Sequence, residues 1–249
     1  MVSAWASTNS LVLGQIKTDE KSNEITAIPE LLKSLELKGC LVTIDAMGCQ
    51  KKIAEVIIEQ EADYLLAVKE NQPTLHQAIQ NYFAEANQAD FEGYEIDFEE
   101  TFDKGHGRLE SRRCWVGYDA LPYLECSPNW EALQTIVMVE SERTVKEKTT
   151  IEHRYYISST KESAANLLNG SRMHWGIENS LHWRLDIAFR EDESRIRKGN
   201  GAENLAILRH IALNLLEKED TAKVGIKNKR LMAGWDDSYL EKVLAGLAS

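Results

Sequence analysis

Cys40-Leu-Val-Thr-Ile-Asp45 is an apolar run, rich in β-branched residues, that ends in one carboxylate. A helical pattern follows over residues 50–60, and a second apolar run reads Asp63-Tyr-Leu-Leu-Ala-Val-Lys69. Strand, helix and strand joined by short links are typical of the crossover that connects parallel strands. The stretch from residue 40 to 69 therefore predicts an α/β fold.

The flanking segments extend this prediction. We expect two strands over residues 1–7 and 11–16, joined by a turn at residues 8–10, and helices over residues 24–35 and 74–87. Helical periodicity then disappears, and short strands are expected at residues 94–98, 113–117, 135–140 and 149–158. Helical patterns return over residues 161–189 and 202–219.

This change of pattern predicts four regions. Residues 1–87 are the N-terminal part of a core, residues 88–157 are a β-rich insertion, residues 158–220 are the C-terminal helical part of the core, and residues 221–249 are a tail. We expect a mixed sheet flanked by helices.

Size and composition exclude several classes of protein. The chain has 249 residues, of which 43% are hydrophobic, which is enough for a buried core. No apolar run approaches 18 residues, so we expect no membrane contact. The first fifteen residues lack Lys and Arg, and the four cysteines form no C-x-x-C pair. We therefore expect no secretory signal, reduced thiols and a cytoplasmic location.

The net charge of −11 argues at first against a nucleic-acid-binding protein. However, eight of the acidic residues lie between residues 85 and 103, a segment without Lys or Arg, and without them the net charge is −3. Residues 190–230 hold ten basic and seven acidic side chains. Because the acidity is local, DNA stays a possible partner.

Asp45 is the first candidate for a catalytic or metal-binding residue. Ligands of open α/β sheets gather at the carboxyl ends of strands, and a carboxylate followed by the small residues Ala46 and Gly48 suits a hard cation. The alternative is that Asp45 caps the helix expected from Gln50. The residues alone leave both interpretations open.

Glu178 is the second candidate. Residues four apart share a helix face, so one polar stripe holds His174, Glu178, His182 and Asp186. An adjacent apolar stripe holds Ile177, Leu181, Leu185 and Ala188. Such a helix can bury the apolar stripe and present Glu178 to a cleft. Two alternatives are a solvated helix face and a zinc set of His174, Glu178 and His182, whose spacing differs from the usual H-E-x-x-H.

Two basic segments could contact phosphate groups. The segment His106-Gly-Arg-Leu-Glu-Ser-Arg112 supplies Arg108 and Arg112, and the segment 195–200 supplies Arg195, Arg197 and Lys198. Exposed charged turns that only aid solubility are the ordinary alternative for both.

Taken together, these residues resemble the ISAs1 group of insertion-sequence transposases, which includes the H-repeat-associated proteins and is related to the IS4 transposases. The resemblance covers essentially the whole chain. The matching runs are Lys17-Thr-Asp-Glu-Lys-Ser-Asn-Glu24, Val42-Thr-Ile-Asp-Ala-Met-Gly-Cys-Gln50, residues 64–72, Gly105-His-Gly-Arg108, His174-Trp-Gly-Ile-Glu-Asn179 and Arg195-Ile-Arg-Lys198.

The resemblance implies an RNase H-like fold with a DDE active site. It assigns the second catalytic Asp to Asp45 and the final Glu to Glu178, both binding Mg²⁺ (or Mn²⁺). Where related transposases carry an Arg one turn before the Glu, this chain has His174, which becomes a candidate DNA contact. The implied reaction is hydrolysis at the element end followed by strand transfer to target DNA, by a homodimer.

One departure from the family pattern concerns the first Asp. The family carries it on a first strand, in an Asp-Gly-Lys motif, upstream of the Val-Ser-Ala stretch with which this sequence opens. We therefore expect the first strand to be missing, an N-terminally truncated chain. The alternative function is a catalytically inactive remnant that at most binds DNA.

Overall fold

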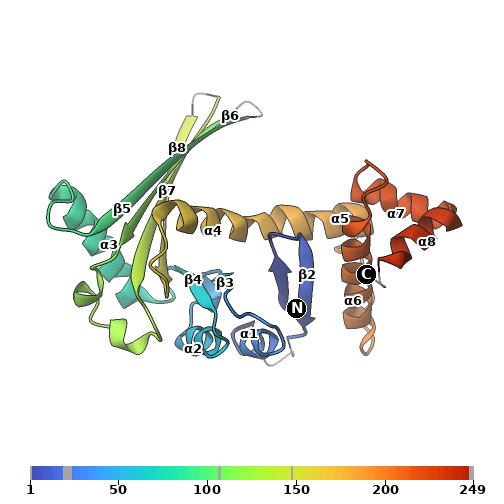
Figure 1. The fold of residues 1–249 in the computed structure, drawn as a ribbon, viewed down its shortest axis with the longest axis horizontal. Helices are drawn as coiled ribbons and strands as arrows, with labels where there is room; N and C mark the ends of the chain where they lie inside the picture. Colours follow the sequence, from blue (N-terminus) through green and yellow to red (C-terminus); the bar gives the residue numbers. More distant parts are fainter. Residues whose placement is uncertain (1, 19–23, 106–107, 147, 247–249) are drawn as a thin grey trace. The chain divides into compact units, whose positions relative to one another are not determined.

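The computed structural model describes residues 2–18, 24–105, 108–146 and 148–246, and at residues 178 and 179 it describes the backbone alone. The chain forms two compact units (Figure 1). Residues 21–174 make up the first, here called the sheet unit. Residues 1–20 and 175–249 make up the second, here called the helical unit.

The predicted crossover is confirmed at the start of the sheet unit. Strand β3 (Leu41–Ile44), helix α2 (Lys51–Glu59) and strand β4 (Asp63–Val68) follow one another, and β3 pairs in parallel with β4, Leu41 opposite Asp63. Helix α1 (Glu24–Lys33) precedes them and helix α3 (Pro73–Gln88) follows, both close to the predicted bounds. The sequence pattern of residues 24–88 was thus sufficient to predict the helices and strands of this region.

The sheet continues through the region predicted to be β-rich. Its strand order is β3-β4-β8-β7-β6-β5, with β5 (Ile96–Gly105), β6 (Arg108–Gly117), β7 (Thr135–Val145) and β8 (Lys148–Ser158) all antiparallel to their neighbours. Because β8 pairs directly with β4, these strands extend the sheet that β3 and β4 begin (Figure 1). A mixed sheet flanked by helices, as predicted, is confirmed.

Helices cover both faces of the sheet where it is apolar. Helix α4 (Ala164–Ile177) places Leu167 and Leu168 against buried side chains of β4, β6 and β7, namely Leu65, Cys114, Val116, Val137 and Val139. The first turn of α4 is fixed to β5, since the Ala164 amide donates to Asp97 Oδ2 at 2.7 Å. On the other face, α2 contacts β4, and α3 contacts β8 through an edge-to-face pair of His76 and Tyr155.

Strands β5, β6 and β7 are longer than predicted, at ten or eleven residues each, whereas β8 matches its predicted bounds to within one residue. The distal halves of β5–β8 form a projecting arm (Figure 1), defined here as residues 99–105, 108–113, 139–146 and 148–154. Charged residues interrupt the hydropathy pattern of β5, β6 and β7. These residues form ion pairs across the strands: Arg113 contacts Glu100 at 2.7 Å and Glu140 at 2.6 Å. Ion pairing between neighbouring strands therefore replaces apolar alternation in the arm.

The helical unit holds the predicted N-terminal hairpin. Strands β1 (Val2–Ala6) and β2 (Leu11–Ile16) pair antiparallel, and Val12 packs in a small core with Leu181, Leu185 and Leu213. The side-chain amide of Asn214 forms two hydrogen bonds with the backbone of β2. The Val12 amide donates to Asn214 Oδ1 at 3.0 Å, and Asn214 Nδ2 donates to the Val12 carbonyl at 2.9 Å. In the predicted apolar stripe, Leu181 and Leu185 are therefore part of this core, Ile177 packs against it, and Ala188 is buried.

The long helix expected over residues 161–189 is interrupted. Between α4 and helix α5 (Trp183–Phe189) lies a π-helical segment, η4 (Glu178–His182). A π turn adds a residue per turn, so the four-residue spacing on which the stripe of His174, Glu178, His182 and Asp186 rests does not continue through η4.

Helix α6 (Gly201–Lys218) matches its prediction, whereas the region predicted as a tail contains α7 (Ile226–Trp235) and α8 (Asp237–Ala245). These helices pack on α6 through Leu215, Leu216, Tyr239 and Val243. The predicted region boundaries near residues 88, 158 and 221 stay a prediction. None of the helices in the described ranges combines the length and the apolar character needed to cross a membrane.

Candidate functional site

Asp45 lies directly after β3 and caps a short turn. Its backbone is extended (φ −66°, ψ 174°), and the amide of Gly48, the last residue of the 3₁₀ turn η1 (Ala46–Gly48), donates to Asp45 Oδ1 at 3.3 Å. Helix α2 begins only at Lys51 and has no side-chain cap. The expected alternative, in which Asp45 caps that helix, is therefore wrong. The carboxylate is exposed and stands at the carboxyl end of a parallel strand pair.

The turn after Asp45 is held from two sides. On its inner side, a Cβ on Gly48 would lie 2.3 Å from Ile44 Cγ2, so only glycine fits there. On its outer side, Asn71 Nδ2 donates to the Ala46 carbonyl, and Gln72 Nε2 donates to the Cys49 carbonyl at 3.0 Å. Asn71 and Gln72 follow β4, so the carboxyl ends of both parallel strands contribute to fixing the Asp45 backbone.

His174 contacts the same strand. Its Nδ1 lies 3.3 Å from Thr43 Oγ1, which is two residues before Asp45 on β3. This hydrogen bond ties the last turns of α4, the helix that leads to Glu178, to the strand that leads to Asp45. Sequence reasoning gave His174 a role in DNA contact; the structure gives it a partner inside the protein.

Glu178 begins the π-helical segment η4, which follows α4 directly. Its side chain lies outside the described part of the chain, and Asp45 and Glu178 belong to different units. Their convergence on one site therefore stays a prediction. So does the zinc alternative, although the described side chains contain no group of three His, Cys, Asp or Glu residues that could hold a metal ion.

The donor chemistry of Asp45 suits a divalent cation. Of its two carboxylate oxygens, Oδ1 accepts one long hydrogen bond, and the exposed side chain can offer oxygen to a hard ion such as Mg²⁺. A second carboxylate would have to come from elsewhere in the chain, and Glu178 is the residue that the resemblance names.

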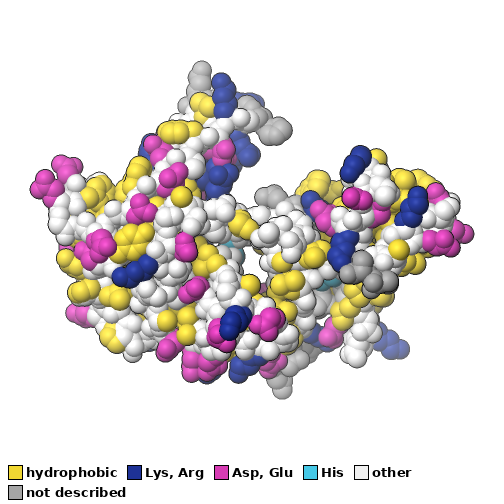
Figure 2. All heavy atoms as spheres, in the orientation of Figure 1, with side chains coloured by type: hydrophobic (Ala, Val, Ile, Leu, Met, Phe, Trp, Pro, Cys, Tyr) yellow, Lys and Arg dark blue, Asp and Glu magenta, His cyan; other side chains and the backbone are white. Residues whose placement is uncertain are grey.

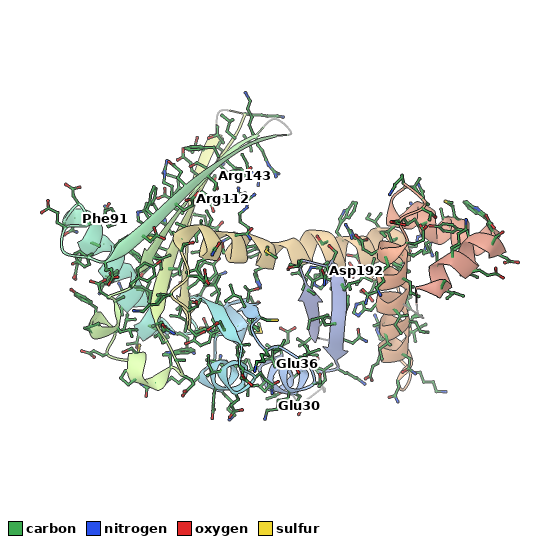
Figure 3. The ribbon with its side chains drawn as sticks, viewed as in Figure 1. Glu30, Glu36, Phe91, Arg112, Arg143 and Asp192 are labelled. Atoms are coloured by element: carbon green, nitrogen blue, oxygen red, sulfur yellow. The ribbon has the colours of Figure 1, made fainter. Side chains whose placement is uncertain are left out.

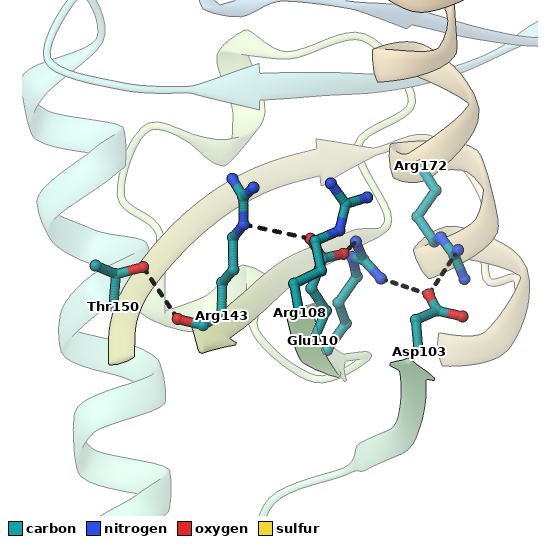
Figure 4. A network of polar contacts seen from close by, with 7 residues as sticks. Asp103, Arg108, Glu110, Arg143, Thr150 and Arg172 are labelled. Carbon is teal, nitrogen blue, oxygen red and sulfur yellow. Dashed lines mark hydrogen bonds and ion pairs between the residues drawn. The ribbon is translucent and has the colours of Figure 1, made fainter. Parts of the chain in front are cut away.

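Arg108 and Arg112 lie four residues apart on β6, so their side chains project from the same face of the arm. Figure 4 shows the polar network around Arg108 on this face. Both arginines contact Glu110, Arg108 through Nε at 3.0 Å and Arg112 through Nη2, and Arg112 Nη1 also donates to Asp103 at 2.7 Å. Two further arginines join this group, Arg143 from β7 and Arg172 from α4. Sequence reasoning did not find Arg143 as a phosphate contact, because only the strand register brings residue 143 beside residue 110.

Arg195, Arg197 and Lys198 lie in an exposed segment between α5 and α6 of the helical unit. The Arg197 guanidinium donates to the carbonyls of Ser194 and Ile196 at 2.9 and 3.0 Å, so the side chain folds back against its own loop. Arg195 and Lys198 are exposed.

Figure 3 shows the positions of Arg112 and Arg143 on the arm.

Comparison with known proteins gives a consistent result. Residues 1–215 match the family described as "Transposase DDE domain". The chain is 43% identical over 252 residues to "H repeat-associated putative transposase YhhI" of Escherichia coli (strain K12), covering 99% of this chain and 65% of that protein. It is 46% identical over 248 residues to "Putative transposase YncI" of Escherichia coli O157:H7, covering 98% and 63%. The chain thus spans slightly less than two thirds of these relatives.

Proposed function

Because the chain belongs to the family of transposases with a DDE domain, we propose that it acts on insertion-sequence DNA, by metal-dependent phosphodiester hydrolysis and strand transfer at the element ends. Its mixed sheet flanked by helices is consistent with the RNase H-like core of such enzymes. The observation that carries the proposal is Asp45, an exposed carboxylate fixed at the carboxyl end of a parallel strand pair within the matched region. The ISAs1 group is the proposed subfamily.

In this proposal, Asp45 and Glu178 are the catalytic residues and the metal ligands. When bound, Mg²⁺ or Mn²⁺ would supply charge that activates the attacking oxygen and stabilises the leaving oxygen. The protein's contribution is to hold the carboxylates. The Gly48 amide donates to the Asp45 carboxylate, and hydrogen bonds from Asn71 and Gln72 to the Ala46 and Cys49 carbonyls fix the turn that follows Asp45, which lowers the cost of bringing the carboxylate to the reacting phosphate.

Helix α4 ends one residue before Glu178. Its start is held by Asp97 on β5 and its later part by the contact between His174 and Thr43. We therefore assign His174 a positioning role in addition to the DNA contact that the resemblance implies. The sequence-based DNA contacts are Arg108, Arg112, Arg195, Arg197 and Lys198. Of these, Arg108, Arg195, Arg197 and Lys198 are proposed to pair with phosphate oxygens, whereas the two terminal nitrogens of Arg112 contact Asp103 and Glu110.

The whole enzyme is proposed to work as a homodimer, as the resemblance implies, and in the cytoplasm, as the cysteine pattern predicts. Its substrates would be the element ends and target DNA. DNA binding without catalysis is the alternative function.

The test is a strand-transfer assay with the full chain, duplexes bearing the element ends, and Mg²⁺ or Mn²⁺. Asp45→Asn and Glu178→Gln should each lower the yield of joined product at least 100-fold while DNA affinity stays the same, because carboxylates that hold catalytic metal act on the reaction step. Glu36→Gln removes an exposed carboxylate of the sheet unit and should leave the yield unchanged.

Two outcomes would contradict the proposal. If Asp45→Asn joined DNA as well as the unchanged protein, Asp45 would not be catalytic. If the unchanged protein bound the element ends but gave no product with either metal, the alternative function as a DNA-binding chain would be supported.

A further inference from the structure

Four arginines gather on one face of the arm around two carboxylates. Arg108, Arg112 and Glu110 come from β6, Arg143 from β7, Asp103 from β5 and Arg172 from α4 (Figure 4). The register explains the gathering, because Glu110 stands opposite both Asp103 and Arg143. The group carries a net charge of +2 in a protein whose net charge is −11.

Glu110 is the centre of this group, and its side chain is only 11% exposed. Its Oε1 lies 3.0 Å from Arg108 Nε and 3.6 Å from Arg143 Nε, and its Oε2 accepts from Arg112. A shielded carboxylate that contacts three guanidiniums restricts their rotamers. Guanidiniums restricted in this way lose less entropy when they bind a ligand.

The arginines differ in what they expose. The Arg112 side chain is 21% exposed, and its two terminal nitrogens contact Asp103 and Glu110, so it acts as an internal link. By contrast, the side chains of Arg108, Arg143 and Arg172 are 44%, 54% and 43% exposed. These three therefore present guanidinium donors to solvent. The backbone of Arg143 is held by the Thr150 hydroxyl, which donates to the Arg143 carbonyl at 3.4 Å.

The opposite face of the arm has the reverse charge. There Arg113, the neighbour of Arg112 in sequence, lies among Glu100, Glu140 and Glu142 at 2.7, 2.6 and 3.5 Å. Successive strand residues point to opposite faces, so the excess of arginine is confined to one side. Figure 2 shows Lys and Arg side chains along the arm with Asp and Glu side chains among them. An anionic ligand would favour the face with Arg108 and Arg143.

We propose that the arm binds the phosphodiester backbone of duplex DNA through Arg108, Arg143 and Arg172, and that Glu110 and Asp103 position these guanidiniums. The proposal rests on DNA as the substrate, as proposed above. Arginine forks match phosphate oxygens in two-point contacts, and such contacts carry affinity and register rather than base sequence. Arg112, which sequence reasoning placed among the DNA contacts, acts in this proposal through Glu110 and Asp103.

The experiment measures binding of a fluorescent 30-base-pair duplex by anisotropy at several NaCl concentrations, with EDTA present so that no cleavage occurs. Arg108→Gln/Arg143→Gln should lower the slope of log affinity against log salt by about 2, and the affinity near 0.1 M salt roughly 50-fold, because two phosphate contacts are lost. The matched control is Lys38→Gln/Lys52→Gln. It removes two exposed cations of the same unit, each paired with one Glu, and should leave the slope unchanged.

A second variant tests the positioning role. Glu110→Gln keeps the shape of the side chain and makes the face more positive, so simple attraction predicts tighter binding. If Glu110 positions the guanidiniums, affinity should fall several-fold in spite of the added positive charge. Tighter binding with an unchanged slope would remove the positioning role.

The proposal is overturned if the double arginine variant, folded by circular dichroism, keeps the slope and affinity of the unchanged protein. This outcome is separate from a failure of the proposed function. If the unchanged protein bound DNA but never joined it, the double arginine variant should still bind DNA more weakly than the unchanged protein. Asp45→Asn should bind DNA as the unchanged protein does, whether or not that protein joins DNA.

Discussion

At the scale of single residues, Asp45 shows how a capping role and an exposed carboxylate can coexist. Its Oδ1 accepts from the Gly48 amide at 3.3 Å, which orders the turn, while the side chain stays open to solvent. Sequence reasoning treated the cap and the functional site as alternatives. The structure shows that an Asp at a strand end can cap a three-residue turn without being buried by it.

Gly48 is the residue that allows this turn. We expect Gly48→Ala to destabilise the protein by about 1–3 kcal/mol, because the added Cβ would lie 2.3 Å from Ile44 Cγ2, an atom close to the backbone of β3. Strand transfer should fall as well, since Asp45 lies between the two clashing residues. The measurements are urea unfolding and the joining assay.

Gly234→Ala is the control for that substitution. Gly234 lies in α7 with nothing within 4 Å of the added Cβ, so alanine should be neutral or stabilise by up to about 1 kcal/mol. Equal effects of the two substitutions would show that the turn at Gly48 has room for a side chain.

The cysteines should differ sharply in reactivity. Burial raises the pKa of both Cys49 and Cys114 to about 12, so at pH 8 only about one thiol in 10⁴ is ionised, whereas Cys40 is exposed and Cys126 half-buried. With Ellman's reagent we expect Cys40 to react first, then Cys126. The two buried thiols should react only in denaturant.

Cys40→Ser provides the control, because it should remove the fastest phase of that reaction alone. Four thiols reacting at one rate in the native protein would contradict the buried positions of Cys49 and Cys114.

At the scale of elements, a buried polar network joins the last three helices. Glu219, after α6, accepts from Thr221 and from the Tyr239 hydroxyl of α8 at 2.6 Å, and Lys229 of α7 lies 3.7 Å from its carboxylate. Lys229 also donates to the Leu216 carbonyl at 3.0 Å. This network fixes α7 and α8 on α6 in a region that the sequence analysis left as a tail.

Because of this network, the stability of these helices should depend on pH. Burial alone would raise the pKa of Glu219, but hydrogen bonds from Thr221 and Tyr239 outweigh it and lower the pKa to about 2. Between pH 4.5 and 2 the unfolded chain binds a proton that the folded carboxylate does not, so stability falls as the pH falls through this range. Glu219→Gln should weaken this dependence, to which Asp236 also contributes because hydrogen bonds lower its pKa as well, and should cost about 2 kcal/mol at pH 7.

The measurement is urea unfolding between pH 2 and 7, followed by tryptophan fluorescence. Asp220→Asn, an exposed neighbour of Glu219, should keep the pH dependence of the unchanged protein. If Glu219→Gln kept it too, another group would have to be its source.

At the scale of the whole molecule, the chain forms two units with separate cores. Leu66 and Val137 are fully buried in the sheet unit, whereas Leu185 and Leu213 are buried in the helical unit beside Val12. Chains with more than one core often depart from two-state unfolding. The two units are therefore expected to respond independently to core substitutions.

Leu213→Ala tests this independence. It should destabilise the helical unit by about 2–5 kcal/mol, because it leaves a cavity among well-packed side chains. In hydrogen exchange read by mass spectrometry, protection should fall in α5 and α6 and stay unchanged in β4 and β7. Leu66→Ala should give the opposite pattern, and a uniform loss of protection in both variants would indicate one cooperative unit.

The sequence by itself determined the parallel crossover, most of the local elements and the family. The apolar runs ending at Asp45 and Lys69 predicted the parallel crossover, because hydrophobic periodicity is a local property, and the motifs around Asp45 and Glu178 led to the transposases. Tertiary structure decided what depends on pairing between distant residues. Only the register of β5 to β7 brings Arg143 beside Glu110, only packing places His174 against Thr43, and only strand pairing brings Arg113 beside Glu100 in the charged arm. Such contacts join residues far apart in the chain, and no local pattern records them.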